Sequence, residues 1–189
     1  LRSLNQDLRR LGSCLIIRQG EPVEILAALL SESGATAIYA EEDYSPYARQ
    51  RDARVRDELP IILTMGLTVH PPELVLKKDG QPYTVFTPFS KTWNALPQPQ
   101  EKDLLPKPVA LNTPVDLPSL RIPDEPTLLD QAPFIPGEVE ALRRLNEFTS
   151  GGESSVYSYG DRRNRPDVNG TSCLSPYIRF GMLSMRQAV

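Results

Sequence analysis

Residues 159–184 read Tyr159-Gly-Asp-Arg-Arg163-Asn-Arg-Pro-Asp-Val-Asn-Gly170-Thr-Ser-Cys-Leu-Ser175-Pro-Tyr-Ile-Arg-Phe-Gly181-Met-Leu-Ser184. An aromatic residue is followed by three arginines, and a Gly-Thr-Ser turn then leads to Ser175-Pro176. Ser favours the N-cap of a helix, and Pro fits the first helical position because its missing N–H would be unpaired there. We therefore expect a helix to begin at Ser175-Pro176, with a second helix start at Ser184 after Gly181.

The hydroxyl groups of Thr171, Ser172 and Ser175 would lie at the positive end of the first of these helices. Such an end can bind phosphate oxygens, because its free N–H groups point outward and the helix dipole favours negative charge. The same residues are also typical of an ordinary helix–turn–helix junction with caps. The hydroxyl motif alone does not separate these two interpretations.

The longer string resembles the start of the FAD-binding domain of DNA photolyases and cryptochromes. That family carries a Tyr, then an Arg, then Arg/Asn-x-Pro, and then Gly-Thr-Ser-x-Leu-Ser-Pro-Tyr-Leu-x-Phe-Gly-x-Leu/Ile-Ser-x-Arg. The matching residues here are Tyr159, Arg163, Pro166, Gly170 to Tyr177, Arg179, Phe180, Gly181, Leu183, Ser184 and Arg186. The resemblance implies that FAD contacts Tyr159, Thr171, Ser172, Cys173, Leu174 and Ser175. It also implies that Arg163 faces the DNA backbone.

A second string, Pro82-Tyr-Thr-Val-Phe-Thr-Pro-Phe-Ser-Lys-Thr-Trp93, also resembles this family. There, a Tyr-x-Val-Phe-Thr-Pro-Phe-x-x-x-Trp segment closes the α/β domain. The residue types themselves indicate a structural role: the aromatic side chains pack, and Pro88 ends the extended run so that a helix starts after Thr87. Asp79-Gly80, just before this string, is typical of a hairpin turn.

The first 70 residues alternate between apolar strand patterns and helical patterns. Helices are predicted over residues 1–12 and 21–33 and from Ser45, and strands over residues 14–18, 35–40 and 67–70. This order favours a parallel sheet with crossover helices. The predicted fold class is α/β, with a partial, Rossmann-like N-terminal domain joined by a long linker to a partial all-α FAD-binding domain.

Proline marks the boundary between the two domains. Ten of the nineteen prolines lie in residues 97–136, where no helix or strand period persists. Such a segment is typical of an extended connector. We expect an α/β domain over 1–96, a linker over 97–136 and the start of a helical domain over 137–189, opening with a helix over residues 136–148. The resemblance implies a fragment that lacks the first strands of the α/β domain and most of the FAD domain.

Composition narrows the function further. The net charge of −3 does not indicate a nucleic-acid binder by bulk charge, so a DNA surface would be a local patch, best placed at Arg162, Arg163 and Arg165. A solvated loop with Asp161 and Asp167 as partners is the alternative interpretation. The cysteines, Cys14 and Cys173, predict neither a disulfide framework nor a metal site, and reduced thiols fit a cytoplasmic protein. There is no apolar run of membrane-spanning length, and because the first residues are charged and helical in pattern we expect no signal peptide.

Two other groups of residues were considered as catalytic or metal sites, and neither pattern favours such a site. His70 is the only histidine, and no Gly-x-Ser-x-Gly elbow accompanies it, so we interpret it as a strand-end residue. Glu41-Glu42-Asp43 is interpreted as a solvated turn, because three adjacent acids do not converge on one metal ion.

The resemblance implies a DNA photolyase, a lyase that uses reduced FAD and blue or near-ultraviolet light to split cyclobutane pyrimidine dimers in damaged DNA by electron transfer. The alternatives are a cryptochrome-like photoreceptor that binds FAD without repair, and a nucleotide-binding protein without light chemistry. The presence and identity of a second, antenna chromophore (a folate or a deazaflavin) are left open, because Tyr47-Ala48 replace the Asn-Glu pair of folate-binding members. We expect a monomer, assign no catalytic residue, and expect the 189 residues alone not to repair DNA.

Overall fold

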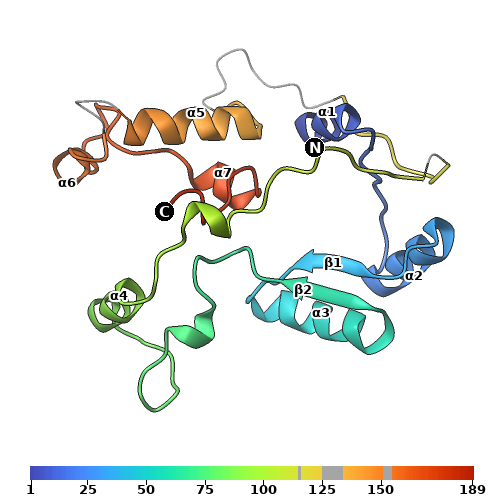
Figure 1. Ribbon diagram of the computed structural model, residues 1–189, viewed down its shortest axis with the longest axis horizontal. Helices are drawn as coiled ribbons and strands as arrows, with labels where there is room; N and C mark the ends of the chain where they lie inside the picture. Colours follow the sequence, from blue (N-terminus) through green and yellow to red (C-terminus); the bar gives the residue numbers. More distant parts are fainter. Residues whose placement is uncertain (115, 125–133, 151–154) are drawn as a thin grey trace. The chain divides into compact units, whose positions relative to one another are not determined.

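The structure is a computed structural model that describes residues 1–114, 116–124, 134–150 and 155–189 (Figure 1). It divides the chain into two compact units. The first unit comprises residues 1–123 together with Val189, and the second comprises residues 124–188.

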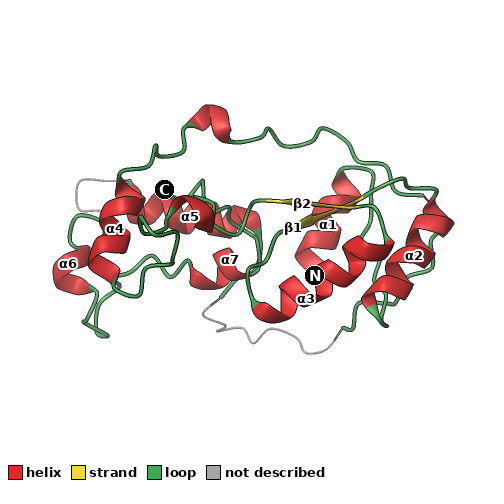
Figure 2. Ribbon diagram, turned by 90° about the horizontal axis from the view of Figure 1, so that it is seen from below, coloured by secondary structure: helices red, strands yellow, loops and turns green. Residues whose placement is uncertain are grey.

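Two parallel strands organise the first unit. β1 (Ile38–Glu41) pairs with β2 (Ile61–Thr64) in a register that runs from Ile38 opposite Ile61 to Glu41 opposite Thr64, and Figure 2 shows the two strands side by side. The helix α3 (Pro46–Glu58) connects them, as a parallel pair requires. The predicted α/β class with a crossover helix is therefore confirmed.

The two other strands predicted from the sequence, over residues 14–18 and 67–70, are wrong. Residues 14–18 form no strand; instead the Ile17 N–H donates to Ser119 Oγ at 2.9 Å and the Ile17 carbonyl accepts from the Leu120 N–H at 2.9 Å. Residues 67–70 are not a strand either; they form a series of bends that leads into the 3-10 turn beginning at Pro72. The strand that pairs with β1 is β2, which the sequence analysis did not predict; only three apolar residues, Ile61 to Leu63, follow the charged helix α3 there.

The helices of the first unit lie close to their predicted positions. They are α1 (Arg2–Arg10), α2 (Pro22–Ser33), α3 and α4 (Phe86–Asn94), with 3-10 turns η1 (Pro72–Leu74) and η2 (Glu101–Asp103). α2 ends at Gly34, whose φ of 69° is a left-handed value that favours glycine. Ser45 caps α3 by accepting the Ala48 N–H at its hydroxyl. The ends of these helices are therefore determined by local capping residues in the sequence.

The second family-like string forms a turn and α4. The predicted turn at Asp79-Gly80 is confirmed, with the Gly80 N–H bonded to the Lys77 carbonyl at 2.9 Å. Trp93 meets His70 edge-on at 5.0 Å between ring centroids, and His70 is buried. The expectation that all the aromatics of this string pack was wrong for Phe86, which is 77% exposed.

The residues before Pro123 lie along the start of the chain. The Leu111 N–H donates to the Leu11 carbonyl at 2.8 Å, and the Arg2 guanidinium donates to the Pro123 carbonyl at 3.1 Å. We therefore retain the division into 1–96, 97–136 and 137–189 as a proposal in which the first part of the linker lies against the α/β domain. The part over 125–133 lies outside the described residues.

The second unit is helical in its described residues. It contains α5 (Glu138–Thr149), α6 (Tyr159–Arg162) and α7 (Ser175–Arg179). Its core consists of the buried side chains of Ala141, Leu174, Tyr177 and Leu183, with Phe134, Leu145, Ile178, Met182 and Ala188 packed around them.

Two details of this unit differ from the sequence-based expectation. Ser175 is the first residue of α7 and not its cap; the cap is Leu174, and no side chain bonds to the free N–H groups. Ser184 starts a turn and not a helix, with its hydroxyl accepting the Arg186 N–H at 3.2 Å. Within the described part of the chain, no helix has the length and apolarity to cross a bilayer.

Candidate functional site

A groove in the second unit brings one face of α5 together with the Gly-Thr-Ser loop. Its volume is about 170 Å³. The described residues that line it are Arg143, Arg144, Glu147 and Phe148 of α5, with Ser155, Asn169, Thr171, Ser172 and Cys173. Hydroxyl, amide and guanidinium groups dominate this lining, which suits an anionic, oxygen-rich ligand.

The loop that forms one wall has an unusual backbone. Gly170 is buried, and a Cβ at this position would lie 2.6 Å from the Arg162 carbonyl oxygen, so only glycine fits. Cys173 has a φ of 51°, the one positive value among the described residues other than glycine. Next, Leu174 turns inward into the core. The loop therefore directs Thr171, Ser172 and Cys173 toward the groove and anchors itself through Leu174.

The six residues predicted to contact FAD are only partly brought together. Thr171, Ser172 and Cys173 line the groove, and the Thr171 hydroxyl lies 3.4 Å from the Cys173 sulfur. Leu174 is buried in the core, so its side chain cannot reach a ligand. Ser175 is exposed outside the groove lining.

Tyr159 is not among the residues that line the groove, but it contacts one that is. Its ring stands edge-on to the Phe148 ring, with centroids 6.2 Å apart, and Phe148 is part of the lining. The Arg163 guanidinium carbon lies 5.7 Å from the centroid of the Tyr159 ring, a cation–π contact. Arg163 is exposed, as a phosphate contact would require.

The neighbouring arginines fit both interpretations of the loop. Arg162 and Arg165 are exposed like Arg163, but Arg165 pairs with Asp167 at 2.5 Å, as a solvated loop would. The hydrogen bond from Arg165 lowers the pKa of Asp167.

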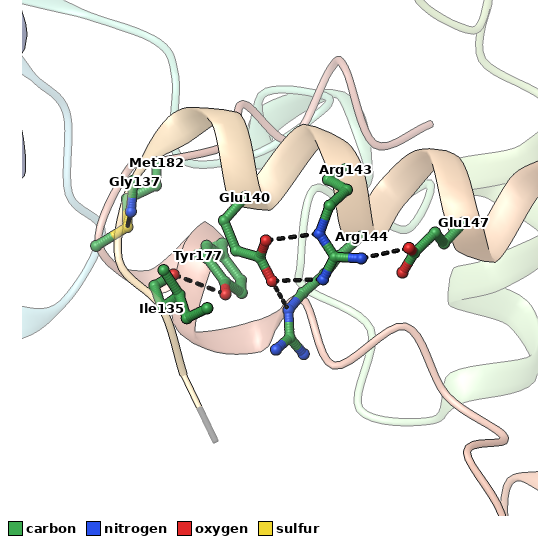
Figure 3. Close-up of polar contacts among 8 residues, drawn as sticks. All are labelled: Ile135, Gly137, Glu140, Arg143, Arg144, Glu147, Tyr177 and Met182. Carbon is green, nitrogen blue, oxygen red and sulfur yellow. Dashed lines mark hydrogen bonds and ion pairs between the residues drawn. The ribbon is translucent and has the colours of Figure 1, made fainter. Parts of the chain in front are cut away.

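An ion-pair network on α5 supports the opposite wall of the groove (Figure 3). Glu140 accepts hydrogen bonds from Arg143 Nε at 2.6 Å and from Arg144 Nε at 2.9 Å, and Arg143 also pairs with Glu147. The bonds from Arg143 and then Arg144 lower the pKa of Glu140 from 4.5 to about 2. The hydrogen bond with Glu140 raises the pKa of Arg144, and nearby Tyr177 and Cys173 also act to raise it.

Tyr177 holds Arg144 from the other side. The Tyr177 ring is fully buried, and its hydroxyl donates to the Ile135 carbonyl at 2.9 Å (Figure 3). The guanidinium carbon of Arg144 lies 5.6 Å from the centroid of this ring. The sequence analysis did not single out Arg143, Arg144 or Glu140. Their spacings of three and four residues predict helical ion pairs, but no local signal places them on a groove.

The groove offers more hydrogen-bond donors to phosphate oxygens than the short helix does. α7 has only five residues, so the positive helix end expected from the sequence contributes little. The hydroxyls of Thr171 and Ser172 and the guanidinium groups on α5 supply the donors instead.

Comparisons with known proteins identify the family. The family model for DNA photolyase matches residues 1–109. The chain is 34% identical to the deoxyribodipyrimidine photo-lyase of a Synechococcus strain, over the whole chain and 41% of the relative. It is also 34% identical to an uncharacterised 31.6 kDa Synechococcus protein, over 98% of the chain and 67% of the relative.

A solved structure agrees with these relatives. The crystal structure of a bacterial class III photolyase from Agrobacterium tumefaciens superposes with a TM-score of 0.84 at 26% identity, covering the whole chain and 41% of that structure. The chain thus spans about two-fifths of the length of the photolyases it matches. Its fold, its two motifs and the matched family model together show that the chain belongs to the DNA photolyase family.

Proposed function

We propose that this protein is a DNA photolyase that uses reduced FAD and blue or near-ultraviolet light to split cyclobutane pyrimidine dimers in DNA. The observation that carries the proposal is the groove in which Thr171, Ser172 and Cys173 face the arginines of α5, in a chain of the photolyase family. Relatives at 33–34% identity are named deoxyribodipyrimidine photo-lyase, which favours this activity over the (6-4) photolyase activity named for a relative at 28%.

In this proposal the groove binds the dinucleotide end of FAD. Thr171 and Ser172 would donate hydroxyl hydrogen bonds to it from the lining, and Ser175, which lies outside the lining, would contact a part of FAD beyond the groove. Leu174 would contribute only backbone groups, since its side chain is buried. Cys173 would set the direction of the loop through its left-handed backbone. When bound, reduced FAD supplies the light-driven electron that opens the cyclobutane ring.

Tyr159 and Arg163 would connect the flavin side of the site to DNA. Tyr159 stands edge-on to Phe148 of the groove and carries the Arg163 guanidinium over its ring, so it would fix both neighbours. Arg163 would contact a DNA phosphate, which positions the strand without reading its sequence. The damaged nucleotide must flip out of the DNA duplex to reach the flavin. Flipping costs a few kcal/mol, and it costs less for a damaged base than for an intact one.

The proposal is tested with the protein at its natural length, loaded with FAD and reduced. Duplexes carrying one thymine cyclobutane dimer, or one (6-4) photoproduct, are exposed to blue light or kept in the dark, and intact thymines are counted. We expect light-dependent loss of the cyclobutane dimer only. Repair of the (6-4) product alone would change the lesion, and a flavin-loaded protein that leaves both lesions intact would favour a cryptochrome-like photoreceptor.

Whether a second chromophore, a folate or a deazaflavin, accompanies FAD is a separate question, and we assign no residues to it. Extraction of the purified protein followed by mass spectrometry answers it. A folate or deazaflavin in the extract would establish an antenna, and FAD as the sole extracted chromophore would exclude one.

A further inference from the structure

We propose that Glu147 is a specificity residue of the flavin site, where its carboxylate accepts a hydrogen bond from a sugar hydroxyl of FAD. This inference rests on the proposed function, because it assumes that FAD occupies the groove. It adds a residue of α5 that lies outside the Tyr159 and Gly170–Ser175 motif, and it names the part of the ligand that this residue recognises.

The lining of the groove singles out Glu147. The other polar side chains there carry guanidinium, hydroxyl, amide or thiol groups, and Glu147 has the one carboxylate among the described lining residues. An ionised carboxylate only accepts hydrogen bonds, so it cannot bond to phosphate oxygens, which also accept. A ligand that satisfies the whole lining therefore carries hydrogen-bond donors as well as anionic oxygens.

FAD carries both kinds of group close together. Its diphosphate joins the ribityl chain of the flavin to the ribose of the adenosine, so hydroxyl groups stand on both sides of the phosphates. A diphosphate seated against Thr171 and Ser172 would bring one of these hydroxyls toward Glu147 in the same groove. Acidic side chains bind ribose hydroxyls in this way in other dinucleotide-binding folds.

The ion pair with Arg143 holds Glu147 at one oxygen and leaves the other open. Arg143 bonds to Glu147 Oε1 through Nη1, and to Glu140 through Nε and Nη2 at 2.6 and 2.7 Å (Figure 3). Among the described residues, no further hydrogen bond reaches the Glu147 carboxylate, and its side chain is 62% exposed. A carboxylate held at Oε1 loses less freedom when Oε2 binds a ligand, so more of the interaction energy appears as affinity.

The same ion pair bears on the competing effect, which is repulsion. A carboxylate near the diphosphate would by itself weaken FAD binding, because like charges repel. Arg143 offsets the charge of Glu147, since its guanidinium bonds directly to the carboxylate. We therefore expect the hydroxyl bond to outweigh the repulsion. The two effects predict opposite changes in FAD affinity when Glu147 is removed.

The test compares Glu147→Ala, Glu147→Gln and the matched control Glu138→Ala in the protein at its natural length, freed of flavin. Glu138 is an exposed acid of the same helix outside the groove lining. Quenching of flavin fluorescence gives the dissociation constant of FAD. We expect about 10-fold weaker binding in Glu147→Ala, as for a lost charge-assisted hydrogen bond, and about 3-fold in Glu147→Gln, which keeps an acceptor. Glu138→Ala should bind like the wild type, and unchanged or tighter binding by Glu147→Ala would overturn the inference.

FAD analogues that each lack one hydroxyl of the ribose or the ribityl chain separate a direct contact from a structural role. If Glu147 bonds to a hydroxyl, the wild type should bind the analogue without that group about 10-fold more weakly than FAD, and Glu147→Ala should bind the two alike. A structural role for the Arg143–Glu147 pair would instead weaken FAD and every analogue equally, and this result would overturn the inference.

The remaining outcomes separate this inference from the proposed function. A wild-type protein that binds no FAD would overturn the proposed function and the role of Glu147 with it. A wild-type protein that binds FAD, with Glu147→Ala discriminating among the analogues as the wild type does, would overturn only the role of Glu147. Thermal unfolding of each variant shows whether the fold is retained, and Glu147→Gln carries the same comparison if Glu147→Ala does not fold.

Discussion

Cys173 shows how a single residue shapes the loop of the site. Its φ of 51° is a conformation that costs a residue with a Cβ about 1–2 kcal/mol. We expect Cys173→Gly to raise the free energy of unfolding by about 0.5–1 kcal/mol, because glycine adopts this backbone without strain. Cys173→Val should lower it by about 1 kcal/mol, since a β-branched side chain tolerates positive φ poorly. Denaturant unfolding at neutral pH measures both.

The same exchange at the other cysteine is the control. Cys14 is half-buried and has no positive φ. There, Cys14→Gly should lower the free energy of unfolding, because glycine gains only unfolded-state entropy and loses packing. Cys173→Gly destabilising the protein as much as Cys14→Gly would show that the left-handed backbone at 173 stores no strain.

Glu140 gives the fold a pH dependence with a definite sign. Its pKa is about 2 in the folded protein, against an ordinary value of 4.5, because Arg143 and Arg144 bond to its ionised form. A depressed folded pKa means that the unfolded chain binds the proton more readily. The stabilisation is therefore complete above about pH 4.5 and is lost as the pH falls toward 2.

This sign predicts how a neutral variant behaves. The free energy of unfolding of the wild-type chain should fall as the pH is lowered from about 5 to about 2.5, and Glu140→Gln should show a shallower fall over the same range. Glu138→Gln, two residues earlier on the same helix, is the matched control and should follow the wild type. Parallel pH profiles for the wild type and Glu140→Gln would contradict the role of the ion pairs. The measurement is urea unfolding at each pH.

At the scale of helices, two serines with similar sequence signals behave differently. Ser45 and Ser175 each precede a proline, but only the Ser45 hydroxyl accepts a helix N–H, that of Ala48. We expect Ser45→Ala to lower the free energy of unfolding by about 1 kcal/mol, the usual contribution of a cap. Ser175→Ala should change it by less than about 0.5 kcal/mol, because the hydroxyl is exposed and does not cap.

FAD affinity should distinguish Ser45 and Ser175 in the opposite sense to stability. Under the proposed function, Ser175→Ala weakens FAD binding, while Ser45→Ala leaves it unchanged. Equal loss of stability in the two variants, measured by denaturant unfolding, would show that Ser175 caps α7 after all. Unchanged FAD affinity in Ser175→Ala would remove Ser175 from the flavin contacts.

The helices were more predictable than the strands for a physical reason. A helix is closed by local hydrogen bonds, so Gly12, Gly34 and Ser45 mark its ends in the sequence itself. A strand is completed by a distant partner. Residues 14–18 have a strand-like pattern, but the N–H and C=O groups of Ile17 bond to Ser119 and Leu120, which no local pattern reveals.

The site was predictable in part for a similar reason. Thr171, Ser172 and Cys173 lie in one short motif, so a resemblance over a few residues could place them together. Arg144 lies 27 or more residues before them in sequence, on a different helix, and lines the same groove, where it contacts Tyr177 and Glu140. Tertiary packing decides this contact, and the sequence shows only a charged helix face.

At the scale of the whole molecule, the groove is too small for the ligand proposed for it. Sites for ligands of this size usually have volumes of about 300–1,000 Å³ and bury most of the ligand surface. The groove has a volume of about 170 Å³ and is open, and the chain spans about two-fifths of its photolyase relatives. The flavin ring would therefore need further walls to be shielded from water.

We accordingly expect the 189 residues alone to repair no cyclobutane dimers, while the protein at its natural length repairs them under the same light. Shielding from water protects the electron transfer, and an open groove cannot provide it. The measurement counts intact thymines after illumination with equal amounts of each protein and added FAD. Flavin absorbance after gel filtration is the control that shows how much FAD each protein retains. Light-dependent repair by the 189 residues would mean that the described groove, together with DNA itself, encloses the flavin well enough for the reaction.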